Sequence, residues 1–145
     1  CRPAIATALN NLGVLALWQG RTETARERLE RSFEIWRTLE GPAGPGRMRS
    51  MANVASVYME AKRYDDAALW LERATAAGRT TYGELHPITV RFQQLYAEAL
   101  KKAGHKAAAR EASRVAAEAR AMMRTMTRSY TVDYRDLGIP EAGRP

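Results

Sequence analysis

The stretch Ala52–Leu69, ANVASVYMEAKRYDDAAL, decides the fold. Its apolar residues recur at helical spacing as far as Tyr58, and a charged segment then interrupts them. Asp65 and Asp66 follow the interruption, and acidic residues favour the first turn of a helix because they complement the partial positive charge there. The stretch therefore predicts a helix, a tight turn and the start of a second helix.

The same pattern occurs once upstream and once downstream. Leu12, Val54 and Tyr96 are 42 residues apart. One such unit cannot bury its apolar stripe alone, whereas stacked units bury it against their neighbours. The repeat therefore predicts an all-α solenoid of three helix-turn-helix units with a thin continuous core. The same step relates further sets of residues, namely Gly20, Lys62 and Gly104; Ala25, Ala67 and Ala109; and Pro45 and Pro87.

The register divides the chain into a repeat domain over residues 1–128, with repeats at about 4–44, 45–86 and 87–126. In the first helix, Leu12 and Gly13 belong to the expected packing face. His86 precedes Pro87, which favours a turn or capping role for this histidine. Helices are expected at about 3–18, 22–38, 47–61, 64–79, 87–102 and from 106 onward.

A change of pattern follows Arg128. Residues 129–134 alternate with strand-like composition, and Gly138 and Pro140 then stop regular structure. One short strand cannot form a sheet alone. We therefore expect residues 129–145 to be an extended tail that stays loose, fills a groove of its own chain, or joins a second copy in a swapped homodimer.

Composition limits the partners. The 145 residues suit one domain, and the net charge of +7 with a pI of about 10 favours acidic peptides, nucleic acid or anionic lipid, unless the basic surface is merely solvated. No stretch approaches the roughly 18 apolar residues of a membrane span. The single cysteine, Cys1, excludes an internal disulfide framework and favours a cytoplasmic setting. Because the sequence begins inside a helical pattern and without Met, we expect a piece of a longer protein.

Motifs for catalysis are absent from the sequence. It has no phosphate-binding glycine loop, no histidine pair at metal-ligand spacing and no cysteine cluster. Neither His86 nor His105 lies in the sequence context of a serine or cysteine nucleophile. The sequence therefore predicts no enzyme activity, no metal and no cofactor.

The repeat resembles the tetratricopeptide repeat. The segments Ala8–Gly13 and Gly83–Pro87, together with the long period, resemble the kinesin-light-chain type, which is also widespread in bacterial regulatory proteins. This resemblance implies a right-handed superhelix that acts as a scaffold for protein–protein interaction. The residues that carry it are Leu12, Gly13, Gly20, Ala25, Leu29 and Ser32 in the first repeat, and Val54, Ala55, Tyr58, Tyr64, Ala67, Leu71 and Ala74 in the second.

In this family the first helix of each repeat lines a concave groove that holds an extended peptide. Asn11 and Asn53 are the strongest candidates, because a side-chain amide can both donate to and accept from a peptide backbone. Arg49 and Arg91 are one period apart, and two guanidinium groups there would suit carboxylates of an acidic peptide. By register, the expected groove residues are Asn10, Asn11, Trp18, Arg49, Asn53, Ser56, Arg91, Gln94 and Glu98.

Alternatives remain open at this point. A basic helical repeat could bind nucleic acid through its arginines, although these are spread over both helices of each unit. The tail could occupy the groove. Each asparagine could simply form a hydrogen bond with a neighbouring helix or a water molecule. Trp18 could pack under a further repeat rather than bind a ligand.

Overall fold

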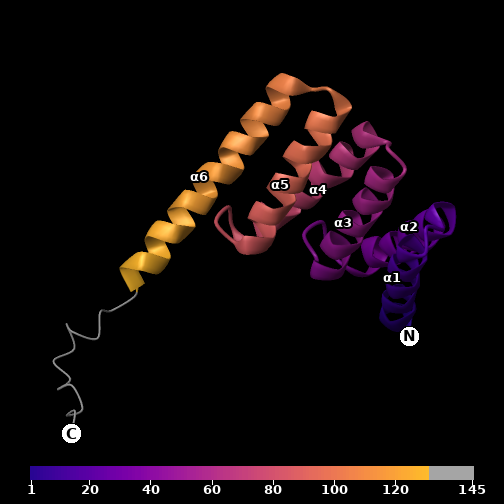
Figure 1. The fold of residues 1–145 in the computed structure, drawn as a ribbon. Helices are drawn as coiled ribbons and strands as arrows, with labels where there is room; N and C mark the ends of the chain where they lie inside the picture. The colour runs from indigo at the N-terminus through magenta and orange to yellow at the C-terminus, as the bar shows by residue number, and fades with distance from the viewer. Residues whose placement is uncertain (131–145) are drawn as a thin grey trace, which may run out of the picture.

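The computed structural model describes the backbone of residues 1–130 and the side chains of residues 1–127. Over that range the chain forms six α-helices and no strand, which confirms the all-α prediction. Consecutive helices pair as three antiparallel hairpins that stack in chain order (Figure 1). The helices are α1 (Arg2–Trp18), α2 (Thr22–Leu39), α3 (Pro45–Glu60), α4 (Tyr64–Tyr82), α5 (Pro87–Ala103) and α6 (Lys106–Tyr130).

Prolines begin the first helix of every hairpin. Pro3, Pro45 and Pro87 lie in the first turns of α1, α3 and α5, where the missing N–H group is not needed. The start of α5 is also capped, because the His86 Nδ1 atom accepts a hydrogen bond from the Ile88 N–H at 3.2 Å. The predicted capping role of His86 is thereby confirmed.

The turn inside each hairpin repeats one backbone conformation. Gly20, Lys62 and Gly104 have φ angles of 72°, 59° and 90°. This left-handed region favours glycine, and Lys62 is the single non-glycine residue with positive φ among residues 1–130. The 42-residue period therefore preserves a backbone geometry at the turn even where the residue type changes.

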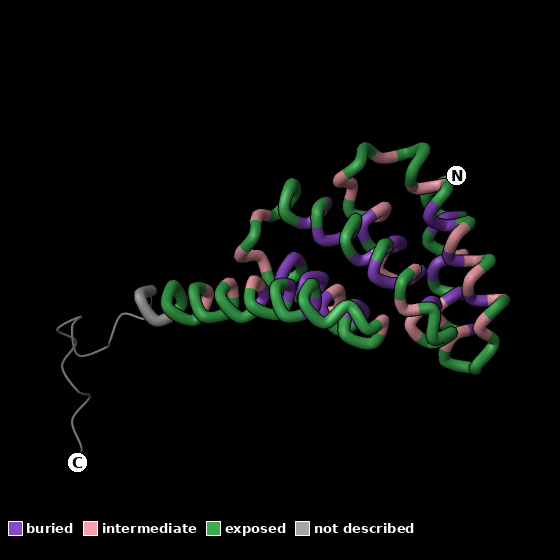
Figure 2. Tube along the Cα trace, turned by 90° about the horizontal axis from the view of Figure 1, so that it is seen from above, coloured by how far each residue is buried: buried purple, intermediate pink, exposed green. Residues whose placement is uncertain are grey.

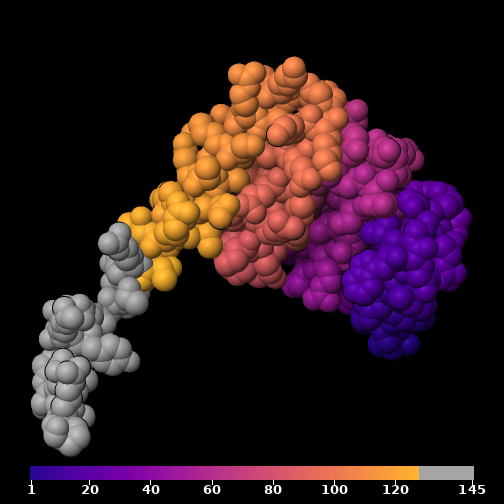
Figure 3. All heavy atoms as spheres, in the orientation of Figure 1, coloured from indigo at the N-terminus to yellow at the C-terminus, as the bar shows by residue number. Residues whose placement is uncertain are grey.

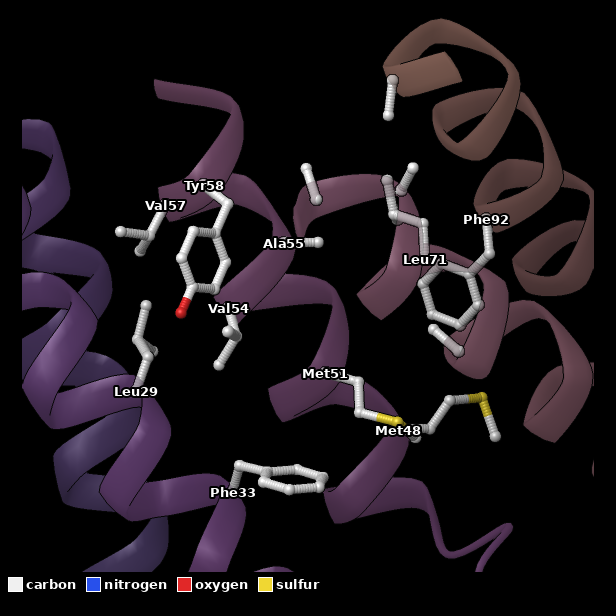
Figure 4. Close-up of a cluster of buried hydrophobic side chains, with 14 of the residues drawn as sticks. Leu29, Phe33, Met48, Met51, Val54, Ala55, Val57, Tyr58, Leu71 and Phe92 are labelled. Atoms are coloured by element: carbon white, nitrogen blue, oxygen red, sulfur yellow. The ribbon is translucent and has the colours of Figure 1, made fainter. Parts of the chain in front are cut away.

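The core is a thin layer between the helices. Leu29, Val54 and Leu71 are almost completely buried and lie on three successive helices (Figure 4). A Cβ atom added at Gly13 would lie 2.5 Å from the Leu29 Cγ atom, so glycine allows α1 to approach α2 closely. Figure 2 shows the buried positions concentrated along the contacts between helices, with exposed positions on their outer sides.

One prediction for α1 was wrong. Leu12, expected in the core, has 46% of its surface exposed. Its equivalent Val54 is fully buried where α3 packs on α2, whereas α1 is the first helix of the stack and has no preceding helix among the described residues. The residues of α1 that are buried are Ala6, Asn10, Gly13 and Ala16.

The last helix is longer than expected. It has 25 residues, and its end reaches away from the body of the molecule (Figures 1 and 3). Ser129 and Tyr130, expected to begin an extended tail, are the last two residues of α6, because the helical backbone continues past Arg128. The rest of the expected tail, and with it the proposed contact with a groove or a second copy, lies outside the described residues.

Candidate functional site

A pocket of about 450 Å³ opens between the N-terminal halves of α3 and α5. It combines two guanidinium groups, those of Arg49 and Arg91, with a mainly apolar wall. Equivalent prolines at the starts of the two helices form part of that wall. The lining residues are Pro45, Met48, Arg49, Ala52, Asn53, Tyr82, Pro87, Ile88, Arg91 and Phe92.

The two arginines of this pocket carry uncompensated charge. Arg49 and Arg91 are exposed, and neither forms an ion pair or hydrogen bond with another residue of the described chain. By contrast, Arg26 on α2 and Arg114 on α6 are each bridged by two glutamates of their own helix. The guanidinium groups at the α3–α5 pocket are therefore free to bind an external anion.

Asn53 makes a contact that the register did not predict. Its Nδ2 atom donates a hydrogen bond to the Oδ1 atom of Asn10 at 2.7 Å, which links α3 to α1. Asn10 is only 8% exposed, and its side chain forms a hydrogen bond with a neighbouring helix. Asn11, the residue one period before Asn53, is exposed. The side-chain Oδ1 atom of Asn53 accepts no hydrogen bond within the described chain and remains available to a ligand N–H group.

The remaining candidates do not gather at this pocket. Gln94 and Glu98 line a separate pocket of about 340 Å³ between α5 and α6, where Glu98 also pairs with Lys102 at 3.2 Å. The Ser56 hydroxyl donates to the Ala52 carbonyl oxygen of its own helix at 3.1 Å. Trp18 is 82% exposed at the end of α1. The candidates thus divide between the α3–α5 pocket, the α5–α6 pocket, the Ser56 position on α3 and the end of α1.

The apolar wall was not anticipated from the sequence. Ile88, Phe92 and Tyr82 complete the α3–α5 pocket but were not among the candidate groove residues. The period contained a signal, because Pro45 and Pro87 recur one repeat apart. The residues that follow these two prolines on α3 and α5 face the same space.

Other kinds of site are not formed by the described residues. No group of three histidine, cysteine, aspartate or glutamate side chains among them could hold a metal ion. His105 instead pairs with Asp65, with 2.6 Å between its Nε2 atom and the Asp65 Oδ1 atom. Within residues 1–130, no helix combines the length and apolar character needed to cross a membrane.

Comparison with known proteins connects this arrangement to a family. A tetratricopeptide repeat model matches residues 4–80. The clustered mitochondria protein homologs of Aspergillus oryzae and Ajellomyces capsulatus are each 27% identical over 92 residues, which is 62% of this chain. The chain spans only 7% of the length of these relatives.

Two solved structures share the fold. The tetratricopeptide-like repeats of a putative kinesin light chain from Podosopora anserina superpose with a TM-score of 0.72 and 22% identity, covering 83% of this chain and 57% of that one. The N-terminal domain of stress-induced protein-1 from C. elegans superposes with a TM-score of 0.68 and 20% sequence identity. This match covers 82% of this chain and 87% of that domain. At this identity the likeness concerns the fold, and it agrees with a kinesin-light-chain-like array. The bacterial association stays a prediction.

The 42-residue period, the three helical hairpins and the family model all indicate an array of tetratricopeptide repeats. The model covers more than half of the chain, and the superposed structures extend the likeness over the third hairpin. The chain belongs to the tetratricopeptide repeat family.

Proposed function

We propose that the chain is a non-catalytic interaction module that binds an extended acidic segment of a partner protein at the α3–α5 pocket. Tetratricopeptide repeats generally mediate protein–protein interaction, and the family is generally non-catalytic. The observation that carries the proposal is the pocket itself, in which Arg49 and Arg91 present uncompensated guanidinium groups beside an apolar wall. The cytoplasmic setting remains a prediction from the single cysteine.

Each part of the pocket has a separate role in this proposal. The guanidinium groups of Arg49 and Arg91 bind carboxylates through charge-assisted, planar hydrogen bonds. Ile88 and Phe92 receive an apolar side chain of the ligand, since 41% of the Ile88 surface is exposed. The side-chain Oδ1 atom of Asn53 accepts a hydrogen bond from a backbone N–H group of the ligand, while the Asn53 Nδ2 atom stays bonded to Asn10. The expected ligand is therefore an extended peptide with a carboxylate next to an apolar residue.

Fluorescence anisotropy with labelled extended peptides tests the proposal. One peptide carries aspartates next to leucine, a second replaces the aspartates with asparagine, and a labelled single-stranded oligonucleotide is the third probe. We expect the acidic peptide to bind most tightly. The double variant Arg49→Gln/Arg91→Gln should weaken it about tenfold or more, because two charge-assisted interactions are lost.

Arg31→Gln/Arg110→Gln is the matched control, because it removes the same charge from two exposed arginines outside the pocket. An equal effect of the control and the double variant would indicate attraction by overall charge rather than a site. Binding of the oligonucleotide alone, with a steep loss as salt is raised, would replace the proposal by nucleic-acid binding through the basic surface.

A further inference from the structure

A second cationic pocket lies between α2 and α4. It has a volume of about 370 Å³ and shares no lining residue with the α3–α5 pocket. The loop between α2 and α3 borders it, and that loop is tied to α4 because the Thr81 hydroxyl donates to the Ala43 carbonyl oxygen at 2.7 Å. The lining residues are Phe33, Pro42, Ala43, Arg47, Met51, Arg73, Ala76, Ala77 and Thr80.

The floor of the α2–α4 pocket is apolar and aromatic. Phe33 and Met51 are buried and lie together at its base (Figure 4). The edge of Phe33 meets Trp70 with 4.8 Å between the ring centroids and 88° between the ring planes. Edge-to-face packing is a favourable arrangement of aromatic rings, so this contact helps to hold the Phe33 ring at the pocket floor.

Two guanidinium groups flank this floor. Arg47 lies over the Phe33 ring and Arg73 over the Trp70 ring, each with 5.7 Å from its Cζ atom to the ring centroid. No carboxylate is among the lining residues, and neither guanidinium forms an ion pair within the described chain. Glu40, the acid nearest to Arg47 in the sequence, accepts a hydrogen bond from the backbone N–H of Arg47 at 2.9 Å.

Arg47 also has an unsatisfied donor. Its Nε atom is buried and has no hydrogen-bond partner. Because protein atoms shield one side of this cation from water, an anion placed against its open side would be attracted more strongly than at a fully hydrated arginine. The pocket therefore combines a partly buried positive charge, a second arginine and an aromatic floor.

We propose that the α2–α4 pocket binds a carboxylate carried on an aromatic group. The two guanidinium groups supply planar donors that match a carboxylate, and the Phe33–Met51 floor accepts the ring. An inorganic anion leaves the apolar floor uncovered, and a neutral aromatic compound leaves both charges uncompensated. Both should therefore bind more weakly than the aromatic acid.

Amide chemical shifts of the full chain, followed during titration, test this assignment. The probes are phenylacetate, its neutral analogue 2-phenylethanol, and inorganic phosphate. We expect phenylacetate to shift the amides of Arg47, Ala76 and Thr80 in a saturable manner and with the highest affinity of the three. Arg73→Gln should weaken phenylacetate binding about tenfold, since it removes one charge-assisted interaction from an exposed position.

Two further variants test whether phenylacetate binds in the pocket rather than to the basic surface in general. Arg31→Gln removes an equal charge from α2 outside the pocket and should leave phenylacetate affinity unchanged. Ala76→Leu fills the pocket without altering its charge and should reduce binding of phenylacetate. The proposal is overturned if Arg73→Gln and Arg31→Gln have the same effect, or if 2-phenylethanol or phosphate binds as tightly as phenylacetate.

A comparison between two ligands identifies the source of the acid. Tighter binding of the blocked dipeptide acetyl-Asp-Phe-amide than of phenylacetate would indicate a partner protein that supplies the carboxylate and the ring from two adjacent side chains. The reverse order would indicate a free organic acid. Because the two pockets share no residue, Arg73→Gln leaves the proposed function at α3–α5 intact, and the two proposals can fail independently.

Discussion

Tyr58 joins the first hairpin to the second through a single side chain. It is a buried residue of α3, and its hydroxyl donates a hydrogen bond to the Glu30 Oε1 atom of α2 at 2.7 Å. Burial and then the neighbouring Glu30 carboxylate raise the pKa of the Tyr58 phenol, because both disfavour the phenolate. Arg26 holds the other Glu30 oxygen at 2.8 Å, so the acceptor is itself fixed.

Tyr58→Phe should lower the free energy of unfolding at pH 7 by about 0.5–1.5 kcal/mol, the usual net contribution of one hydrogen bond. The pKa is raised in the folded state, so the contribution of Tyr58 is complete below the unfolded value of about 10 and is lost as the pH rises through the folded pKa. Urea unfolding at pH 8 and pH 11 should show a smaller difference between parent and variant at pH 11. A difference that grows with pH would contradict the assigned contact.

The two asparagines show how far residue-level prediction reaches. The family resemblance predicted Asn53 in a groove together with Asn11, and Asn53 lines the α3–α5 pocket, whereas Asn11 does not. The residue that Asn53 contacts is Asn10, which precedes the equivalent position Asn11 by one residue. A spacing of 42 identifies equivalent positions in two repeats, not the atoms that touch.

At the scale of elements, α6 differs from the other helices. It has 25 residues, whereas α2 and α4 have 18 and 19. Residues 124–127 are exposed on every side of this helix (Figure 2), and its last turns extend past the hairpin partner α5 (Figure 1). The strand-like pattern of residues 129–134 predicted that the repeat domain ends at Arg128, but α6 extends to Tyr130.

Hydrogen exchange should reflect this difference. Backbone amides of residues 120–127 should exchange faster than those of residues 51–58 on α3, because few buried apolar contacts stabilise the end of α6. The measurement is native-state exchange followed by mass spectrometry or NMR. Equal protection of the two segments would mean that the end of α6 is covered by another part of the chain or by a second copy.

At the scale of the molecule, the core is one continuous layer shared by consecutive hairpins. Leu71 is 2% exposed in the middle of that layer. Leu71→Ala should lower the free energy of unfolding by about 2–5 kcal/mol, because the cavity cannot close against neighbouring helices. Chemical denaturation measures the change. A loss below about 1 kcal/mol would contradict the packing described for α4.

The repeat architecture could be predicted from the sequence because turns, helix starts and buried positions recur with the same period. The turn residues Gly20, Lys62 and Gly104 are one example. The α3–α5 pocket could be predicted in part, through Arg49, Asn53 and Arg91. Its apolar wall could not, because Ile88 and Phe92 follow a turn whose geometry is set by the packing of α4 on α5. The exposure of Leu12 depends on which helices surround α1, and a local pattern does not contain that information.

The central claim is that an acidic peptide binds at the α3–α5 pocket, and mapping of amide chemical shifts tests it most directly. The tightest-binding acidic peptide is titrated into the isotopically labelled chain at moderate salt. We predict that the largest saturable shifts fall on Arg49, Asn53, Ile88 and Arg91, and that Arg49→Gln/Arg91→Gln abolishes them. Shifts spread over the exposed arginines of α6, or shifts that survive the double variant, would contradict the claim.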